Sequence, residues 1–182
     1  MIGGAELRRT LGALLDRYIL RWPAEAEVVS RFRDFLSSGE ELQGKSNLAR
    51  HITSSAWIVD PTRTEVLLTH HGKLHKWLQL GGHTDEGEDW LETAVREARE
   101  ESGLNHLTVV DPDLFDLDIH EIPERPGQAA HLHYDLRFLL EANPALPLVV
   151  SEESHDLAWV RLHQLGDYTT EESQLRMARK TR

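Results

Sequence analysis

One acidic segment, residues 81–104, constrains the fold of this chain more than any other. It holds eight carboxylates and only two arginines, a formal charge of −6. Asp89 is a good helix N-cap, Glu92 three residues later completes a capping box, and Gly103 is a natural C-terminal stop. These local signals predict a helix over about residues 90–102.

This helix is expected to have two distinct faces. One face is apolar and should pack on a sheet; it carries Leu91, Ala94, Val95 and Ala98. Glu97, Glu100 and Glu101, at i, i+3 and i+4, gather on a different face. Like charges so spaced cost an isolated helix about 0.2–0.5 kcal/mol per pair, a cost that a bound divalent cation would relieve. A solvated acidic surface is the alternative interpretation.

Patterns typical of strands lie on both sides of this helix. Residues 51–60 alternate and are rich in β-formers, and a turn leads into a second strand that ends at His71. We expect further strands at 77–80, 107–111, 116–122, 131–140, 147–150 and 157–162, and a last helix at 169–179. Strands around a central helix, with a second helix at the end, predict an α/β fold with a mixed sheet covered by helices.

The first part of the chain predicts a helical hairpin. Apolar residues recur at helical spacing from Leu7 to Tyr18 and again from Val28 to Leu36, with a break at Pro23. We assign residues 1–45 to this hairpin and residues 46–182 to the main domain. The hairpin could cap the sheet, form a homodimer contact or act as a lid, and we expect the cap because an amphipathic stripe must be buried.

Charge and composition exclude several classes of function. A formal charge of −11 argues against broad binding to DNA or RNA, which needs lysine and arginine to displace phosphate counterions. The chain has no cysteine, which excludes disulfides, thiolate zinc sites and thiol nucleophiles, while eleven histidines remain as possible ligands. No stretch approaches the roughly 20 apolar residues of a membrane span, and the early apolar run is too short for a signal peptide. We expect a cytoplasmic protein that does not bind membranes.

Seven residues of the acidic segment stand at fixed offsets. From Gly82 the pattern reads G-x5-E-x7-R-E-A-x-E-E-x-G-L, ending at Leu104. This string resembles the signature of the Nudix hydrolase family, although the family more often has a larger aliphatic residue at the position of Ala98. The resemblance covers 23 residues. It implies a Nudix-type α/β/α sandwich, with the N-terminal hairpin outside the resemblance.

Nudix enzymes cleave a diphosphate linked to another moiety by attack of water on phosphorus, using Mg²⁺ or Mn²⁺. The resemblance implies that Glu97 and Glu101 are the principal metal ligands and Glu100 a further or water-mediated one. A backbone carbonyl of Gly81 or Gly82 would complete the shell. The expected partner is a small phosphorylated molecule, a nucleotide derivative being the first candidate.

The supporting residues of such a site can also be named. Arg96 is placed to pair with Glu88 and hold the preceding loop against the helix. The general base varies within the family, between a glutamate of the signature and a carboxylate of a late loop. Glu152 and Glu153 are the candidates for that loop, and solvated surface acids are the alternative.

Several basic and aromatic residues could contact substrate. His71 and Lys73 belong to a basic segment at 70–76 that could attract phosphates or simply be solvated, and His83 lies in the loop of the signature. His131, His133 and Asp135 alternate, so they point to one side of a strand, which faces either the cleft or water. Trp57, Trp77 and Tyr134 are expected in the core rather than stacked on a base.

Two rival functions remain. A nucleotide-binding or regulatory module of the same fold would not turn its ligand over, although it would have less need of all four signature glutamates and Arg96. The isomerase branch of the fold resembles a case that needs a catalytic cysteine, which this chain lacks. The sequence therefore favours metal-dependent hydrolysis of a diphosphate linkage.

Overall fold

The computed structural model describes residues 2–44 and 47–181. Along this part of the chain the elements follow one another as α1 (Gly4–Arg21), η1 (Pro23–Glu25), α2 (Ala26–Ser37), β1 (Arg50–Val59), β2 (Glu65–His71), β3 (Trp77–Leu78), β4 (Leu80–His83), α3 (Trp90–Ser102), β5 (Thr108–Val109), β6 (Asp116–Ile122), β7 (His131–Glu141), β8 (Ser154–Arg161), η2 (Leu162–Asp167) and α4 (Glu172–Lys180). None of the helices described is long and apolar enough to span a bilayer.

Strand β1 is the centre of the sheet. It pairs in parallel with β7 over ten registered positions, from Arg50 opposite Leu132 to Val59 opposite Glu141. Its other edge pairs antiparallel with two strands in turn, first β4 and then β2. Strand β6 extends the sheet beyond β7, and β8 extends it beyond β2. The sheet is therefore mixed, as expected.

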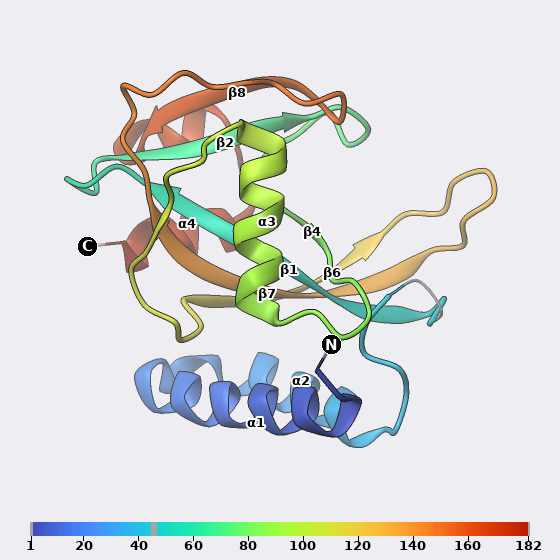
Figure 1. Cartoon of the computed structure of the whole chain (residues 1–182). Coiled ribbons are helices and arrows are strands. Elements are labelled where there is room, and N and C mark those ends of the chain that lie inside the picture. Colours follow the sequence, from blue (N-terminus) through green and yellow to red (C-terminus); the bar gives the residue numbers. More distant parts are fainter. Residues whose placement is uncertain (1, 45–46, 182) are drawn as a thin grey trace.

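Successive residues of β1 face opposite layers because side chains alternate along a strand. Ala56 packs in one core cluster with Ala98 of α3, and its neighbour Trp57 packs in another with Met177 of α4. Helices α3 and α4 thus cover opposite faces of the sheet (Figure 1). The α/β/α sandwich that the sequence resemblance implies is confirmed.

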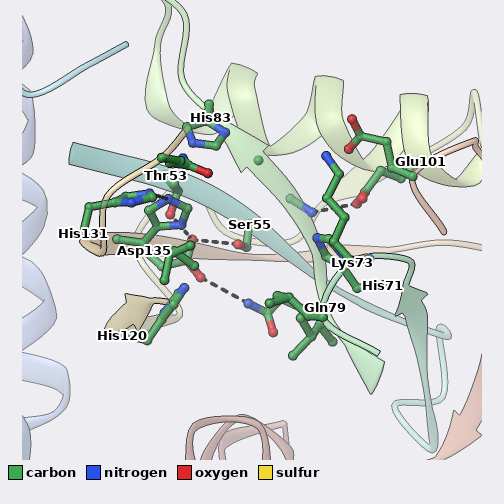
Figure 2. A pocket seen from close by; sticks show the side chains of 18 of the residues that line it. Thr53, Ser55, His71, Lys73, Gln79, His83, Glu101, His120, His131 and Asp135 are labelled. Atoms are coloured by element: carbon green, nitrogen blue, oxygen red, sulfur yellow. Dashed lines mark hydrogen bonds between the residues drawn. The ribbon is translucent and has the colours of Figure 1, made fainter. Parts of the chain in front are cut away.

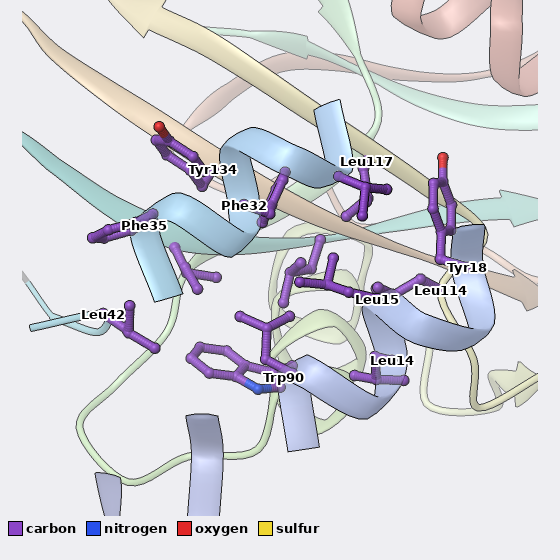
Figure 3. Packing of buried hydrophobic residues seen from close by; sticks show 14 of the residues in the cluster. Leu14, Leu15, Tyr18, Phe32, Phe35, Leu42, Trp90, Leu114, Leu117 and Tyr134 are labelled. Carbon is purple, nitrogen blue, oxygen red and sulfur yellow. The ribbon is translucent and has the colours of Figure 1, made fainter. Parts of the chain in front are cut away.

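The N-terminal hairpin buries its apolar stripe within the chain. Leu11 and Leu15 of α1 and Phe32 and Phe35 of α2 are almost fully buried in a cluster that also contains Tyr134 of β7. Figure 3 shows Leu15, Phe32, Phe35 and Tyr134 of this cluster between the helices and the sheet. The hairpin therefore caps the sheet, as the amphipathic pattern predicts.

A buried ion cluster joins the hairpin to the last helix. The carboxylate of Asp116, with no exposed surface, accepts hydrogen bonds from Arg137, Arg176 and Lys180. Lys180 also lies 2.6 Å from Glu25, in the turn between α1 and α2. Asp116 thus connects strands β6 and β7 to α4, and Lys180 connects α4 to the hairpin.

Two predicted elements differ in the structure. The prediction of a strand at 147–150 is wrong, because this segment runs across the end of α3 instead of along a sheet edge. The Val149 N–H donates to the Ser102 carbonyl at 2.8 Å, and Leu148 packs on the cluster beneath α3. The segment at 77–80 divides between β3 and β4, whose partners are β2 and β1.

The cluster at Asp116 gives a stability prediction. Asp116→Asn should lower the free energy of unfolding by about 3–5 kcal/mol, because the buried Arg137 and Lys180 and the partly buried Arg176 all lose their shared carboxylate partner. Asp113→Asn is the control, since its ion pair with Arg17 is half exposed and is expected to contribute at most about 1 kcal/mol. Urea unfolding of both variants measures the difference. Equal losses would contradict the central role of Asp116.

Candidate metal and substrate site

The site forms where strand β4 lies between β1 and α3. Gly81 pairs with Ser55 and Gly82 with Ser54. A Cβ atom at Gly81 would lie 2.5 Å from the Cα of Ser55, and one at Gly82 would lie 2.5 Å from the carboxyl carbon of Glu97. Only glycine leaves room at both positions, so the acidic side chains of α3 lie directly against the β4 backbone.

Glu101 is the most buried of the signature glutamates. Its side chain is part of the face that packs on the sheet, and the residue is 7% exposed. The Gly81 N–H donates to its Oε2 atom at 2.9 Å. The pKa of Glu101 is raised to about 8, chiefly by burial and also by the nearby charges of Glu97 and Glu153, while the hydrogen bond from Gly81 opposes the rise. A neighbouring cation would favour its charged form.

The face expected for Glu101 needs correction. The sequence pattern placed it with Glu97 and Glu100, away from the sheet, whereas the helix is turned so that Glu101 lies beneath β4. Leu91 and Val95, expected on the packed face, are only half buried. The reason is local, because the Gly81 N–H donates a hydrogen bond to the Glu101 carboxylate where α3 packs on β4.

Arg96 holds the loop of the signature against α3, as expected. It makes a bidentate ion pair with Glu88, with hydrogen bonds of 2.8 and 3.0 Å, and donates to the His83 carbonyl at 3.1 Å. Burial alone would raise the pKa of Glu88, yet the hydrogen bonds from Arg96 lower it. Arg96 also donates to Glu97 at 2.8 Å and to Glu100 at 3.1 Å.

The three glutamates of α3 do not converge on one point. Glu100 turns outward to Arg96, and its side chain is 60% exposed. Among the described residues, no three carboxylates bring ligand atoms within 4.8 Å of one another. The other two carboxylates, Glu97 and Glu101, are more buried, and burial raises the pKa of each.

These carboxylates fit a hard divalent cation. Burial disfavours the charged forms of Glu97 and Glu101, and neighbouring carboxylates add to this, Glu100 and Glu153 in the case of Glu97, and Glu97 and Glu153 in the case of Glu101. A cation beside them would oppose both effects. Their donor atoms are all oxygen, the preference of Mg²⁺ and Mn²⁺. Glu153, in the loop before β8, adds a third negative charge, which raises the pKa of both Glu97 and Glu101.

A pocket of about 300 Å³ opens beside this acidic group. Ten of the residues singled out from the sequence line it: Gly81, Gly82, Glu101, Glu153, His71, Lys73, His83, His131, His133 and Asp135. Figure 2 shows Glu101 and Lys73 at one end and His131 at the other. A second cavity next to it is lined by Arg96, Glu97 and Glu100, and shares Gly82, His83, Glu101 and Glu153 with the first. Glu152 and Glu88 line neither cavity.

The strand of His131 and His133 faces this pocket rather than water. Asp135, on the same side, accepts hydrogen bonds from Thr53, Ser55, Gln79 and Arg137, at distances of 2.7–3.1 Å. With four donors and almost no exposed surface, Asp135 is a structural anchor of the pocket floor. Burial and the neighbouring imidazoles lower the pKa of His133 to about 2.

Sequence reasoning missed two histidines of this pocket region. His51 lies opposite His133 in the parallel pairing of β1 with β7, and His120 lies opposite His133 in the antiparallel pairing of β6 with β7. The alternation of each strand gives the side of the sheet, but only the register brings the three residues together. Of the aromatics, Trp57 and Tyr134 are in the core as expected, while Trp77 is half buried and stacks on His70.

Comparisons with known proteins agree with this architecture. The NUDIX domain family model matches residues 49–180. A probable DHNTP pyrophosphohydrolase from Lactococcus lactis subsp. cremoris is 32% identical over 58% of this chain and 62% of its own length. A bis(5'-nucleosyl)-tetraphosphatase (asymmetrical) from Mus musculus is 44% identical over 25% of this chain and 33% of its own length.

A solved structure supports the same relationship. A hydrolase of the NUDIX family from Clostridium perfringens is 26% identical, covers 74% of this chain and 97% of its own, and superposes with a TM-score of 0.58. The alignments with the two curated relatives span less than two thirds of either relative, so they do not transfer a substrate. The family match, in contrast, covers most of the chain, including the whole sheet and both helices that cover it, and this chain belongs to the NUDIX family.

Proposed function

We propose that this chain hydrolyses a diphosphate linkage in a nucleoside diphosphate derivative or a related phosphorylated metabolite, with Mg²⁺ or Mn²⁺ as cofactor. The observation that carries the proposal is a pair of carboxylates, the buried Glu101 and the partly buried Glu97, which lie against a glycine strand beside two adjoining cavities. Family membership and the names of the two relatives, both of which act on phosphate anhydrides, support the reaction class.

Glu97 and Glu101 are the proposed metal ligands. The carbonyl of Gly81 or Gly82 joins them, and Glu100 contributes through water because its carboxylate turns outward. When bound, the metal supplies a positive charge that neutralises the phosphates and lowers the pKa of the attacking water. Arg96 and Glu88 position the loop and touch no substrate in this scheme.

Phosphate binding is assigned to the basic end of the pocket. Lys73 and Arg125 line it and supply positive charge in an otherwise acidic protein. Burial lowers the pKa of His71, and the charges of Lys73 and Arg125 lower it further against the opposing effect of Glu153. His71 therefore acts as a neutral hydrogen-bonding group near pH 7, while Lys73 and Arg125 balance the charge of the substrate.

Glu153 is the proposed general base. It lines both cavities and acts electrostatically on Glu97 and Glu101, whereas Glu152 lines neither. Its loop is fixed to the basic segment, because the Gly72 N–H donates to the Glu153 carbonyl at 2.8 Å. A Cβ at residue 72 would lie 2.8 Å from the same oxygen, so glycine permits this contact. Glu153 can thus take the proton of a water molecule beside the metal ligands.

The ligand role of Glu101 is tested with Glu101→Gln. Against a panel of nucleoside triphosphates, nucleotide sugars, dinucleoside polyphosphates and DHNTP, we expect kcat/KM to fall by more than about 100-fold, because a ligand matters more than the residues that orient it. Mg²⁺ at 100 times its Kd should raise the free energy of unfolding of the wild type by about 2.7 kcal/mol and leave that of the variant unchanged. Wild-type binding without turnover on this panel would instead support a regulatory module.

The base is tested by comparing Glu153→Gln with Glu152→Gln. The first substitution should lower kcat by about 10²–10⁴-fold, the range of general base catalysis, and keep the Kd for Mg²⁺ within about threefold. Glu152→Gln has the same chemistry on the next residue and should keep kcat within about twofold. Full activity of Glu153→Gln would assign the base to a glutamate of α3.

A further inference from the structure

Five histidines form one cluster at the end of the pocket away from Lys73. Their rings contact one another with centroid separations of 4.8–5.5 Å; they are His51 of β1, His83 of β4, His120 of β6, and His131 and His133 of β7. The sheet register brings them together, because His133 lies opposite both His51 and His120. The proposed hydrolysis assigns no step to this cluster as a unit.

We propose that this cluster is a second metal site, which binds a nitrogen-preferring divalent ion such as Zn²⁺ through His51, His131 and His133. One ring nitrogen from each of these residues lies within 4.8 Å of those of the other two. The site differs from the carboxylates of α3 in its ligand atoms and in the strands that supply them. It stands whether or not the chain hydrolyses a diphosphate.

The distance between two of the rings fits shared coordination. The Nε2 atoms of His131 and His133 are 3.2 Å apart. Two imidazoles bound to one tetrahedral Zn²⁺, each at about 2.0–2.1 Å, have nitrogens about 3.3 Å apart. The separation of this pair thus matches that of two ligands of one ion, and His51 stacks on His131 at 5.1 Å between centroids.

The opposite ring nitrogens are held in the manner of metal-ligating histidines. His131 Nδ1 lies 2.9 Å from the Ala129 carbonyl oxygen, and His51 Nδ1 lies 3.3 Å from that of Asn47. An N–H donated to a carbonyl fixes the ring and leaves its other nitrogen as the ligand. His120 Nδ1 lies 3.1 Å from the Asp118 carboxylate, but His120 is outside the group of three whose ring nitrogens lie within 4.8 Å of one another.

The donor type decides which ions the site selects. Imidazole nitrogen suits Zn²⁺, Co²⁺, Ni²⁺ and Cu²⁺, whereas Mg²⁺ and Mn²⁺ prefer carboxylate and carbonyl oxygen. His51 and His131 are buried, while His133 borders the pocket. Three protein nitrogens leave a coordination position for water or a phosphate oxygen on the pocket side.

The test uses metal binding rather than activity. Purified metal-free protein is held in excess Mg²⁺, which occupies oxygen sites, and titrated with Co²⁺ while visible absorption is recorded. We expect the intense absorption of tetrahedral Co²⁺ to saturate at one equivalent and to be displaced by Zn²⁺. His131→Gln and His133→Gln should each weaken binding by at least about 100-fold.

Matched controls separate this site from other ligands. His155→Gln removes the exposed pair in which His155 Nε2 lies 3.3 Å from His75 Nδ1, and Glu101→Gln removes the buried carboxylate. Both should keep the one-equivalent absorption of the wild type. Binding that is lost in either control, or kept in both cluster variants, would overturn the proposal.

A measurement on the wild type covers the case in which a cluster variant does not fold. X-ray absorption at the zinc edge of protein loaded with one equivalent of Zn²⁺ in excess Mg²⁺ should show at least three imidazole ligands. A shell made only of oxygen would place the ion at the carboxylates and overturn the assignment.

Discussion

The close approach of helix α3 to strand β4 is the constraint on which the rest of the site depends. At Gly81 and Gly82 there is no space for a single methyl group, because the Ser55 backbone lies on one side and the Glu97 carboxylate on the other. Strand β4 is itself held in register with β1. Glu97 and Glu101 are therefore positioned by the sheet as well as by the helix, whereas Glu100 turns outward.

Strand β1 pairs with β4 on one edge and with β7 on the other, and so lies next to both of the ligand sets proposed above. The proposed oxygen donors belong to α3 and lie against β4, whereas the proposed nitrogen donors belong to β1 and β7. Hard and borderline cations sort between such sets by chemistry, since neither set needs to exclude the other ion by size. Four hydrogen-bond donors hold the Asp135 carboxylate between them.

The sequence predicted what local chemistry determines and missed what depends on register. Asp89 and Gly103 act within one helical turn, so the limits of α3 could be read directly, as could the pairing of Arg96 with Glu88. The segment at 147–150 has a strand-like composition, but the end of α3 offers it a partner that no local pattern contains. Nor could the pattern show that His51 faces His133, because their distance in space depends on how two strands 82 residues apart are aligned.

The ion cluster at Asp116 has a consequence for the order of events during synthesis. Arg176 and Lys180 follow Asp116 by 60 and 64 residues, so the ribosome delivers them long after the hairpin and most of the sheet have emerged. Until then Arg137 is the only one of the three cations that can compensate the buried carboxylate. The nascent sheet therefore forms around Asp116 with Arg137 as its partner, and the link from Asp116 through Lys180 to Glu25 of the hairpin is completed only when α4 arrives.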